Sequence, residues 1–243
     1  MALEKVSNRV YYLPQENETD RPNLYYILGD AYSLAIDAGN SKAHVDKFYQ
    51  AIREMGFRLP DYTAITHWHW DHTFGMHAVN GVTITGHKTH EKLQGVMNWA
   101  WTDEAMQKRL QNGEEIAMCD RDIRVEYPDR SKIMVTTAKV VFHGKLILDL
   151  GNIRCELQEI PAPHSRDSVI LYIPEEKMLA VGDADCGDHY ENGGKYDPFL
   201  LEGMIDLLES IPFETYLLGH DIPQDKTEVL AYLREEMSKL ATA

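Results

Sequence analysis

A short histidine-rich segment between Thr66 and His72 is the part of this sequence best suited to chemistry. His67, His69, Asp71 and His72 follow the pattern H-x-H-x-D-H. Imidazole nitrogens and carboxylate oxygens are ligands that zinc, iron and manganese accept in proteins. His67 and His69 are two residues apart, so both point to the same side of an extended segment. Asp71 and His72 follow where the chain is expected to turn into a helix. The segment therefore predicts a loop that can supply ligands to two metal ions.

Three further candidate ligands each follow a predicted strand. His164 lies in a proline-containing loop after one strand, Asp183 ends the strand that begins at Met178, and His220 follows the strand that begins at Thr215. Sites are commonly built at strand ends, because the scaffold fixes the loop that follows. Any one of these residues would be weak support for a site. In this order along the chain, together with the H-x-H-x-D-H segment, they predict a metal centre.

These pieces resemble the metallo-β-lactamase-fold hydrolases over nearly the full length of the chain. The resemblance rests on Asp37 at the end of a predicted strand, the segment 67–72, His164, Asp183 and His220. It implies an α/β fold, a four-layer αββα sandwich with the site at one edge of its two sheets. It also implies that residues 1–243 form a single domain.

The resemblance divides the candidate ligands between two divalent metal ions. Zinc is expected, with iron and manganese as alternatives. The first ion would be held by His67, His69 and His164. The second would be held by Asp71, His72 and His220, and Asp183 would bridge the two ions. Two neighbouring dications require anionic ligands to offset their repulsion, and the two aspartates supply that charge.

Three residues outside the ligand set also receive roles from the resemblance. Asp37 is expected to orient the ligand loops without touching a metal, as outer partners of metal ligands do. The alternative is a turn carboxylate that caps a loop. His189 and Tyr190 follow Asp183 closely and are candidates for substrate binding, where either could stabilise developing negative charge. The alternative for both is a glycine-rich surface loop.

The activity implied is metal-dependent hydrolysis. A hydroxide bridging the two ions would attack the substrate, and Asp71 would carry a proton to the departing group. No serine or cysteine nucleophile is needed, and no G-x-S-x-G pattern is present. A small ester, lactone or thioester is the expected substrate, with a small phosphodiester second. A β-lactam is disfavoured, because the resembling β-lactamases carry a cysteine or another non-bridging residue at the position of Asp183.

Two other functions are compatible with the same segment. Some relatives hold one iron ion and oxidise persulfides with oxygen, and their H-x-H-x-D-H pattern is the same. An oxidoreductase of this persulfide-dioxygenase type is therefore the alternative to the hydrolase. A non-catalytic binding protein that keeps metal for structure is the third possibility, but it has no use for a ligand set with an open water position.

The elements expected to position these residues form two halves of similar build, each with strands followed by a helix. In the first half, strands are expected at 9–13, 23–28, 33–39, 63–66 and 82–85, with a helix at about 42–55. In the second half, strands are expected at 140–142, 146–150, 153–157, 169–173, 178–181 and 215–218, with helices at about 198–210 and 223–240. Hairpin turns are expected at 144–145 and 175–177. Two packed sheets with helices outside would bury such strands.

Residues 87–130 differ in character from both halves. This stretch is polar, helix-prone and rich in methionine and tryptophan, so it is expected to form a helical insertion that lies over the rest of the domain. Met97, Trp99, Trp101 and Met106 are expected to form its core. Long additions to a scaffold also act as active-site lids, which is the second interpretation of this segment.

Composition limits the partners of the chain. It has 243 residues, a hydrophobic content of 44% and a formal net charge of −15. That charge repels phosphate backbones and anionic membranes, so we expect a small-molecule substrate and neither nucleic acid nor membrane as a partner. The three cysteines, Cys119, Cys155 and Cys186, do not form a disulfide framework. With no export segment and no membrane-spanning run, a cytoplasmic location is expected.

Overall fold

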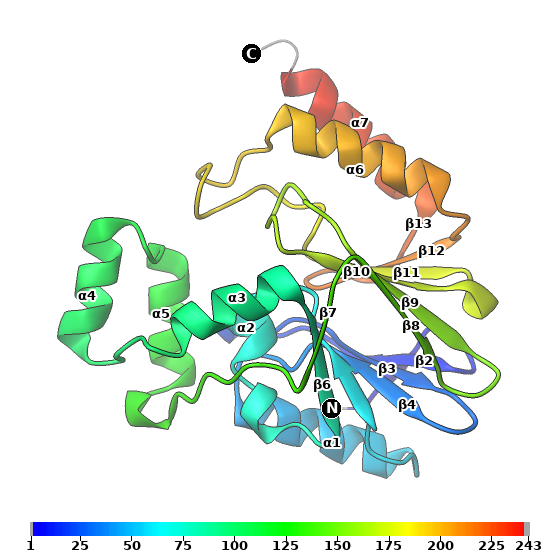
Figure 1. The fold of residues 1–243 in the computed structure, drawn as a ribbon, viewed down its shortest axis with the longest axis horizontal. Coiled ribbons are helices and arrows are strands. Elements are labelled where there is room, and N and C mark those ends of the chain that lie inside the picture. The colour runs from blue at the N-terminus through cyan, green and yellow to red at the C-terminus, as the bar shows by residue number, and fades with distance from the viewer. Residues whose placement is uncertain (1, 241–243) are drawn as a thin grey trace.

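The computed structural model describes residues 2–240 and shows two β-sheets packed face to face, with helices on both outer sides (Figure 1). The layers in order are helix α1 (Lys42–Glu54), the first sheet, the second sheet, and helices α6 (Pro198–Ser210) and α7 (Lys226–Leu240). The four-layer αββα sandwich predicted from the sequence is confirmed.

The first sheet contains seven strands that lie in the order of the sequence. They are β1 (Glu4–Lys5), β2 (Val10–Leu13), β3 (Leu24–Leu28), β4 (Ser33–Ile36), β5 (Tyr62–Ala64), β6 (Val82–Gly86) and β7 (Val140–Phe142). Neighbours from β1 to β4 are antiparallel, and neighbours from β4 to β7 are parallel. Because β4 and β5 are parallel, the residues that follow them leave the sheet at one edge. Asp37 is thereby brought next to the histidine-rich loop.

The second sheet contains six strands in the order β13-β12-β11-β10-β9-β8. They are β8 (Lys145–Asp149), β9 (Arg154–Glu159), β10 (Val169–Ile173), β11 (Met178–Gly182), β12 (Thr215–Leu218) and β13 (Gln224–Asp225). Only β11 and β12 are parallel neighbours among these strands. Asp183 and His220 therefore leave this sheet at the same edge.

The main core lies between the inner faces of the two sheets. Ile27 and Leu34 of the first sheet belong to the same buried cluster as Leu157 and Leu171 of the second. Separate clusters join the first sheet to α1 and the second sheet to α6 and α7. Burying a leucine or isoleucine side chain stabilises a fold by about 1.5–3 kcal/mol, so these three clusters hold the four layers together.

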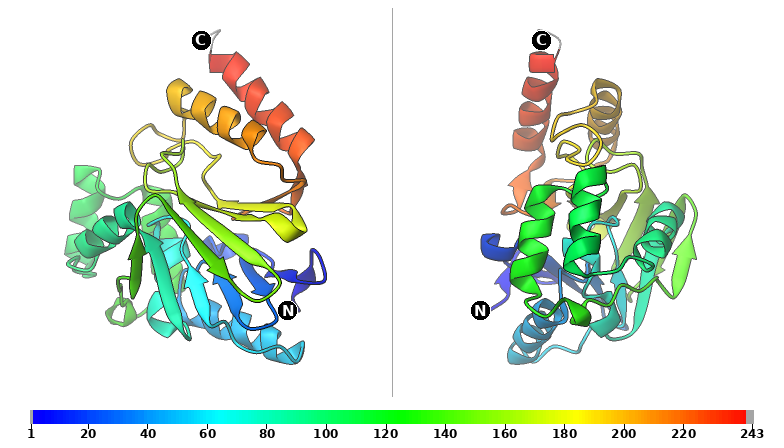
Figure 2. Two further views of the ribbon diagram at one scale, coloured as in Figure 1. Left: turned by 45° about the vertical axis from the view of Figure 1, so that its right-hand side comes forward. Right: turned by 90° about the vertical axis from the view of Figure 1, so that its left-hand side faces the viewer.

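The predicted helical insertion is present as three helices, α3 (His87–Val96), α4 (Asp103–Asn112) and α5 (Ala117–Glu126). It lies at one end of the sandwich (Figure 2) and packs against Trp70 and Phe74, which follow the loop after β5. Met106 is buried in its small core, and Trp99 and Trp101 pack partly buried against the same core. The guanidinium of Arg109 lies 4.5 Å from the ring centroid of Trp99 and 4.7 Å from that of Trp101. Met97, in contrast, is about half exposed.

Besides the exposure of Met97, other sequence predictions also differ from the structure. The hairpin expected at residues 144–145 is wrong, because β7 pairs with β6 in the first sheet whereas β8 pairs with β9 in the second. Gly144 has a φ of +70°, so the chain turns there from one sheet to the other. The last helix begins at Lys226 and not at position 223, because residues 224–225 form β13. The hairpin expected at 175–177 is confirmed.

Within residues 2–240, none of the helices combines the length and the apolar character that crossing a membrane requires.

Candidate metal centre

The histidine-rich loop follows β5 and ends in helix α2 (Trp70–Thr73), a single buried turn. The hydroxyl of Thr73 donates a hydrogen bond of 2.8 Å to the carbonyl oxygen of His69, which ties the turn to the loop before it. His67 and His69 precede the helix, and Asp71 and His72 lie within it. The predicted turn into a helix at this point is therefore confirmed, whereas the residues before it form a loop that bends at Trp68.

The structure brings all seven predicted ligands together in two adjacent groups, each with its ligand atoms within 4.8 Å of one another. The first group consists of His67, His69 and His164. The second group consists of Asp71, His72, Asp183 and His220. Both groups combine residues from the loop after β5 with residues that follow strands of the second sheet, so the site lies where the two sheets meet at one edge.

In the first group one imidazole nitrogen has no hydrogen-bond partner among the described residues and two others face each other. His67 Nε2 is buried and has no hydrogen-bond partner within residues 2–240. His69 Nδ1 and His164 Nε2 lie 3.0 Å apart. The other nitrogen of His164 is 3.0 Å from the carbonyl oxygen of Gly187, which fixes the ring. Converging imidazole nitrogens held by outer hydrogen bonds fit a divalent metal ion.

The second group is built around two carboxylates. His72 Nε2 lies 2.9 Å from Asp71 Oδ2 and 3.1 Å from Asp183 Oδ2. His220 Nε2 lies 3.1 Å from Asp71 Oδ2 and 3.5 Å from Asp183 Oδ2. Asp183 Oδ2 is also 3.8 Å from His164 Nε2, which belongs to the first group. Asp183 therefore lies between the two groups, in the position expected of a bridging ligand.

The charges of the two groups differ when no metal is bound. Burial, reinforced by the neighbouring imidazoles, lowers the pKa values of His67 and His69 well below the usual range. Burial would also lower the pKa values of His72 and His220, but Asp71 and Asp183 raise both well above the usual range. His67 and His69 are thus neutral imidazoles, whereas the second group is a set of paired opposite charges. Both groups provide metal ligands once the imidazoles of the second group have lost their protons.

Asp37 connects β4 to both halves of the histidine-rich loop. Its Oδ1 accepts a 2.7 Å hydrogen bond from the backbone N–H of Thr66, and its Oδ2 lies 2.7 Å from His72 Nδ1. The hydroxyl of Thr66 also donates to this carboxylate. Asp37 has a φ of +64°, a left-handed conformation that is uncommon outside glycine. Its carboxylate lies beside the second ligand group and orients His72.

Gly219 is required where the second sheet meets the second ligand group. A Cβ atom at this position would lie 2.1 Å from Asp183 Oδ1 and 3.1 Å from the ring of His72. Its backbone N–H donates to the carbonyl oxygen of Gly182, and its carbonyl oxygen accepts from the N–H of Asn23. Any side chain at position 219 would displace two ligands of the same group.

The two predicted substrate contacts lie on different sides of the loop that follows Asp183. The ring of His189 is exposed, and its centroid lies 6.5 Å from that of His164. The ring of Tyr190 packs 4.9 Å from that of His69, and its hydroxyl donates a 2.8 Å hydrogen bond to Glu115 Oε1. Tyr190 therefore joins the first ligand group to the helical insertion.

Two carboxylates near the site were not predicted from the sequence. Asp20 Oδ1 lies 3.8 Å from His220 Nδ1, and burial together with the charge of Asp71 raises the pKa of Asp20 to about 7. Burial together with the charge of Asp183 raises the pKa of Asp185 to about 7. The hydroxyl of Tyr216 beside this carboxyl opposes the rise in its pKa.

Comparison with known proteins agrees with this arrangement. The model of the metallo-beta-lactamase superfamily matches residues 19–220. The sequence matches no curated protein.

Similar solved structures include a metallo-beta-lactamase from Pontibacter korlensis, with 17% identity, 97% of this chain and 98% of that chain covered, and a TM-score of 0.64. The stereoselective inverting sec-alkylsulfatase Pisa1 from Pseudomonas sp. has 16% identity and a TM-score of 0.69, with 97% of this chain but 41% of the sulfatase covered. At these identities the likeness shows the fold. Because the family model covers most of the sequence, this chain belongs to the metallo-β-lactamase superfamily.

Proposed function

We propose that this protein is a dinuclear metal-dependent hydrolase that cleaves a small ester, lactone or thioester. The observation that carries the proposal is the pair of adjacent ligand groups with Asp183 between them. His67, His69 and His164 would hold one divalent ion, and the four residues of the second group would hold the other. Zinc is the first choice because tetrahedral nitrogen and oxygen ligand sets suit it.

Two divalent ions at these groups would polarise a substrate oxygen and lower the pKa of water enough to supply a nucleophile at neutral pH. The protein then needs no nucleophilic side chain. Its own residues position the ligands and handle protons. Asp71 Oδ2, which lies within 3.1 Å of both His72 Nε2 and His220 Nε2, is our candidate for carrying a proton to the leaving group.

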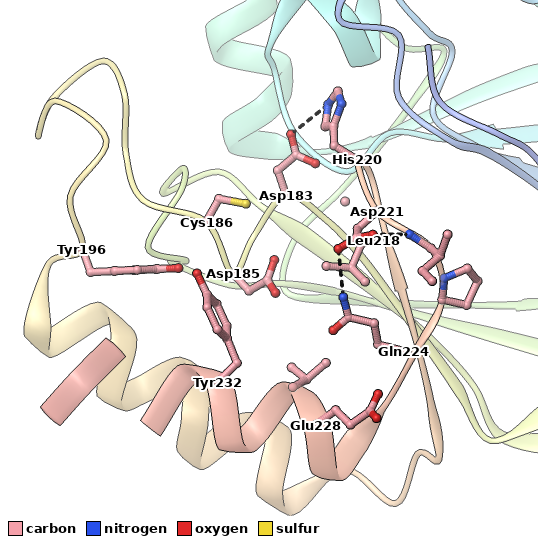
Figure 3. A pocket seen from close by; sticks show the side chains of 14 residues that line it. Asp183, Asp185, Cys186, Tyr196, Leu218, His220, Asp221, Gln224, Glu228 and Tyr232 are labelled. Carbon is pink, nitrogen blue, oxygen red and sulfur yellow. Dashed lines mark hydrogen bonds and ion pairs between the residues drawn. The ribbon is translucent and has the colours of Figure 1, made fainter. Parts of the chain in front are cut away.

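The surroundings of the second group support a neutral or cationic substrate over an anionic one. Asp183 and His220 form one wall of a pocket of about 740 Å³, whose other lining residues include Asp185, Asp221 and Glu228 (Figure 3). The volume is in the range of small-molecule sites. Carboxylates around such a pocket disfavour a phosphodiester, because like charges in a partly buried space repel strongly.

The proposal is tested by removing and restoring metal. The protein is stripped with a chelator, its fold is checked by circular dichroism, and zinc, manganese or iron(II) is added back while thioester, lactone, ester, phosphodiester and β-lactam substrates are assayed. We expect turnover of a neutral carboxylic substrate that returns at two ions per chain. One iron ion per chain with oxygen uptake, and no hydrolysis, would contradict the proposal.

A ligand variant gives a second test. His69→Ala should lose metal from the first group and reduce kcat/KM by about two orders of magnitude or more, because the open site loses one of its three imidazoles. The matched control is His143→Ala, which removes an exposed imidazole from the turn after β7. Metal content is measured by mass spectrometry. Unchanged metal content in His69→Ala would refute the ligand assignment.

A further inference from the structure

The second sheet ends in an open edge strand, β8. Of the strands at the edges of the two sheets, β1 and β13 have two residues each and β7 has three, whereas β8 has five. Its pairing with β9 runs from Lys145 to Asp149 without a shift in register. Short length, bulges and proline commonly protect sheet edges, and β8 has none of these features. It is therefore the edge best suited to pairing with another strand.

The hydrogen bonds with β9 fix which backbone groups of β8 face outward. The N–H of Leu150 donates to the carbonyl oxygen of Ile153 at 2.9 Å. Backbone groups alternate along an antiparallel strand, so the even-numbered residues of β8 face β9 and the odd-numbered residues face away from it. The part of the chain that the structure describes supplies no further strand at this edge. The N–H groups of Ile147 and Asp149 are thus open, as are the carbonyl groups of both residues and of Lys145.

The side chains of β8 alternate in the same way. Leu146 and Leu148 pack partly buried against the main core between the sheets. Lys145, Ile147 and Asp149 are exposed on the outer face, and Ile147 is 59% exposed. The outer face of this strand thus has an apolar centre, a positive charge at one end and a negative charge at the other. Such a pattern is complementary to itself when the strand is reversed.

An antiparallel copy of β8 centred on Ile147 would use the open backbone groups. Each Ile147 N–H can donate to the carbonyl oxygen of the facing Ile147, and each Asp149 N–H can donate to that of the facing Lys145. Both lysine side chains then lie opposite an aspartate, and the two isoleucines cover each other. A shift of one residue would set outward groups against inward ones, and a shift of two would place charges opposite Ile147.

The outer face of β9 is compatible with this pairing. Across the hairpin, Gln158 lies opposite Lys145 and Arg154 lies opposite Asp149, so no like charges would be adjacent in these rows of the joined sheet. Glu156 lies opposite Ile147, and its copy would be three strand spacings away, or about 14 Å. Physiological salt screens charges beyond about 8 Å, so neither this pair nor the net charge of −15 prevents a locally complementary contact.

We propose that β8 binds β8 of a second copy of this chain, antiparallel and centred on Ile147, so that the two six-stranded sheets become continuous. A strand of another protein could use the same backbone groups, but the self-complementary charges favour a copy. Because the strand is short, the dimer should be reversible and should dissociate on dilution. The proposal does not depend on the hydrolase function.

Sedimentation velocity measures the dimer, and nuclear magnetic resonance locates it. Over about a hundredfold range of protein concentration at physiological salt, we expect the wild-type protein to change from monomer to dimer. Hydrogen exchange of the Ile147 and Asp149 amides should slow as the dimer forms, because these N–H groups gain acceptors. Exchange in β13, at the opposite edge of the same sheet, should not change.

Charge reversals test the register. Lys145→Glu would place carboxylates opposite each other at both ends of the paired strands, so it should raise the Kd of the dimer by roughly tenfold or more. Asp149→Lys should have the same effect by opposing two lysines. Asp149 also accepts a hydrogen bond from the N–H of Gly151, so the fold of this variant is checked by circular dichroism. Lys108→Glu, the same charge change at an exposed position on α4, should leave the Kd unchanged.

Combining the two reversals gives the sharpest prediction. The double variant Lys145→Glu/Asp149→Lys should recover the wild-type Kd, because both pairs are restored with their signs exchanged. A mixture of the two single variants should form mixed dimers, because the introduced carboxylate faces the introduced ammonium group and the original pair is kept at the other end. A different register or a different face of the protein would not produce this recovery.

A backbone variant tests the hydrogen bonds separately from the charges. Ile147→Pro removes the central N–H, and an edge strand tolerates proline where that N–H faces away from its neighbour. The monomer should therefore keep its circular dichroism spectrum while the dimer is lost. Ile147→Val keeps both the N–H and a branched apolar side chain, and it should still dimerise.

Two results would overturn the proposal. One is a wild-type protein that stays monomeric at every concentration. The other is a dimer with the same Kd in Lys145→Glu as in Lys108→Glu, which would place the interface elsewhere. Weaker dimers in the single reversals, with recovery in the double variant and in the mixture, would support the pairing of β8 with its copy.

Discussion

At the scale of single residues, a substitution of Asp37 tests whether its contact with His72 positions the second ligand group for a metal ion. Asp37→Asn replaces one accepting oxygen with an N–H₂ group, which must then face one of the donors, Thr66 or His72. We expect metal affinity of the second group to fall by about 10- to 100-fold, as for other outer partners of metal ligands. The measurement is a zinc titration in competition with a chromophoric chelator.

The control for Asp37→Asn is Asp46→Asn, an exposed change on α1 that removes the same charge. Equal zinc affinities in the two variants would support the alternative interpretation of Asp37, a carboxylate that caps a turn. A loss in Asp37→Asn alone would show that its contact with His72 matters for binding the second ion.

His44, which is not a candidate ligand, gives a pH prediction. This histidine of α1 is buried, and neither ring nitrogen has a partner within residues 2–240. Burial, assisted by the charge of Arg21, lowers the pKa of His44 to about 3. Between about pH 3 and pH 6.5 the unfolded chain therefore binds a proton that the folded chain does not, and the free energy of unfolding falls as the pH falls, by about 1.4 kcal/mol per pH unit.

The effect is measured by urea unfolding of the metal-free protein from pH 4 to pH 8. Below pH 6.5, the slope of unfolding free energy against pH should be smaller in His44→Leu than in wild type by about 1.4 kcal/mol per pH unit, which corresponds to one proton. Above pH 7 the slope should be unchanged. His143→Gln, which changes an exposed histidine, serves as the comparison. Identical slopes in wild type and His44→Leu would mean that His44 is protonated in the folded protein.

The sequence pointed to the candidate ligands of segment 67–72 because their types and short spacing are unusual, but it did not point to the carboxylates around them. Asp20, Asp185 and Glu115 belong to no local pattern. Each matters only because burial and distant neighbours act on it, as the raised pKa of each carboxyl indicates. Such effects come from tertiary contacts, which residue types along a chain do not report.

At the scale of elements, the sequence pattern predicted the bounds of helices and strands better than it predicted which strands pair. Helix α6 begins at position 198, as predicted, where Asp197 caps it through the N–H groups of Phe199 and Leu200 and proline occupies its first turn. Strand β12 also has its predicted bounds. Strands β7 and β8 were located correctly but assigned to one hairpin, because alternation of side chains does not say which sheet a strand joins.

Tyr190 gives the prediction at this scale, because it fixes the loop after β11 to the insertion. Tyr190→Phe keeps the ring against His69 but leaves the buried Glu115 without the hydroxyl that donates to it at 2.8 Å. The loss of this donor should cost about 1–3 kcal/mol of unfolding free energy, and it should increase hydrogen exchange in α5 and in the 186–197 loop.

Tyr172→Phe is the matched control, since the Tyr172 hydroxyl donates to the carbonyl oxygen of Pro212 at an exposed position. That variant should stay within about 0.5 kcal/mol of wild type. If both variants lose the same stability, or if exchange in α5 stays at the wild-type rate, the contact between Tyr190 and Glu115 does not hold the insertion in place.

At the scale of the whole molecule, we propose that the chain behaves as a single domain. The two sheets share one buried cluster, so neither inner face can be exposed without the other. The ligand groups add a second connection, because the loop after β5 belongs to the first sheet, whereas His164, Asp183 and His220 follow strands of the second. Ions that bind only the folded chain therefore stabilise both sheets at once.

Calorimetry tests whether the two sheets unfold together as one domain. We expect one unfolding transition, with equal calorimetric and van't Hoff enthalpies, in the zinc-loaded and in the chelator-treated protein. Zinc should raise the transition temperature by about 2–4 °C for each kcal/mol of binding free energy, and it should move the whole transition, because both sheets contribute ligands. His69→Ala should show a smaller shift on adding zinc. Two separate transitions after chelation, with zinc moving only one of them, would mean that the sheets fold independently and that the shared core between them is too weak to couple them.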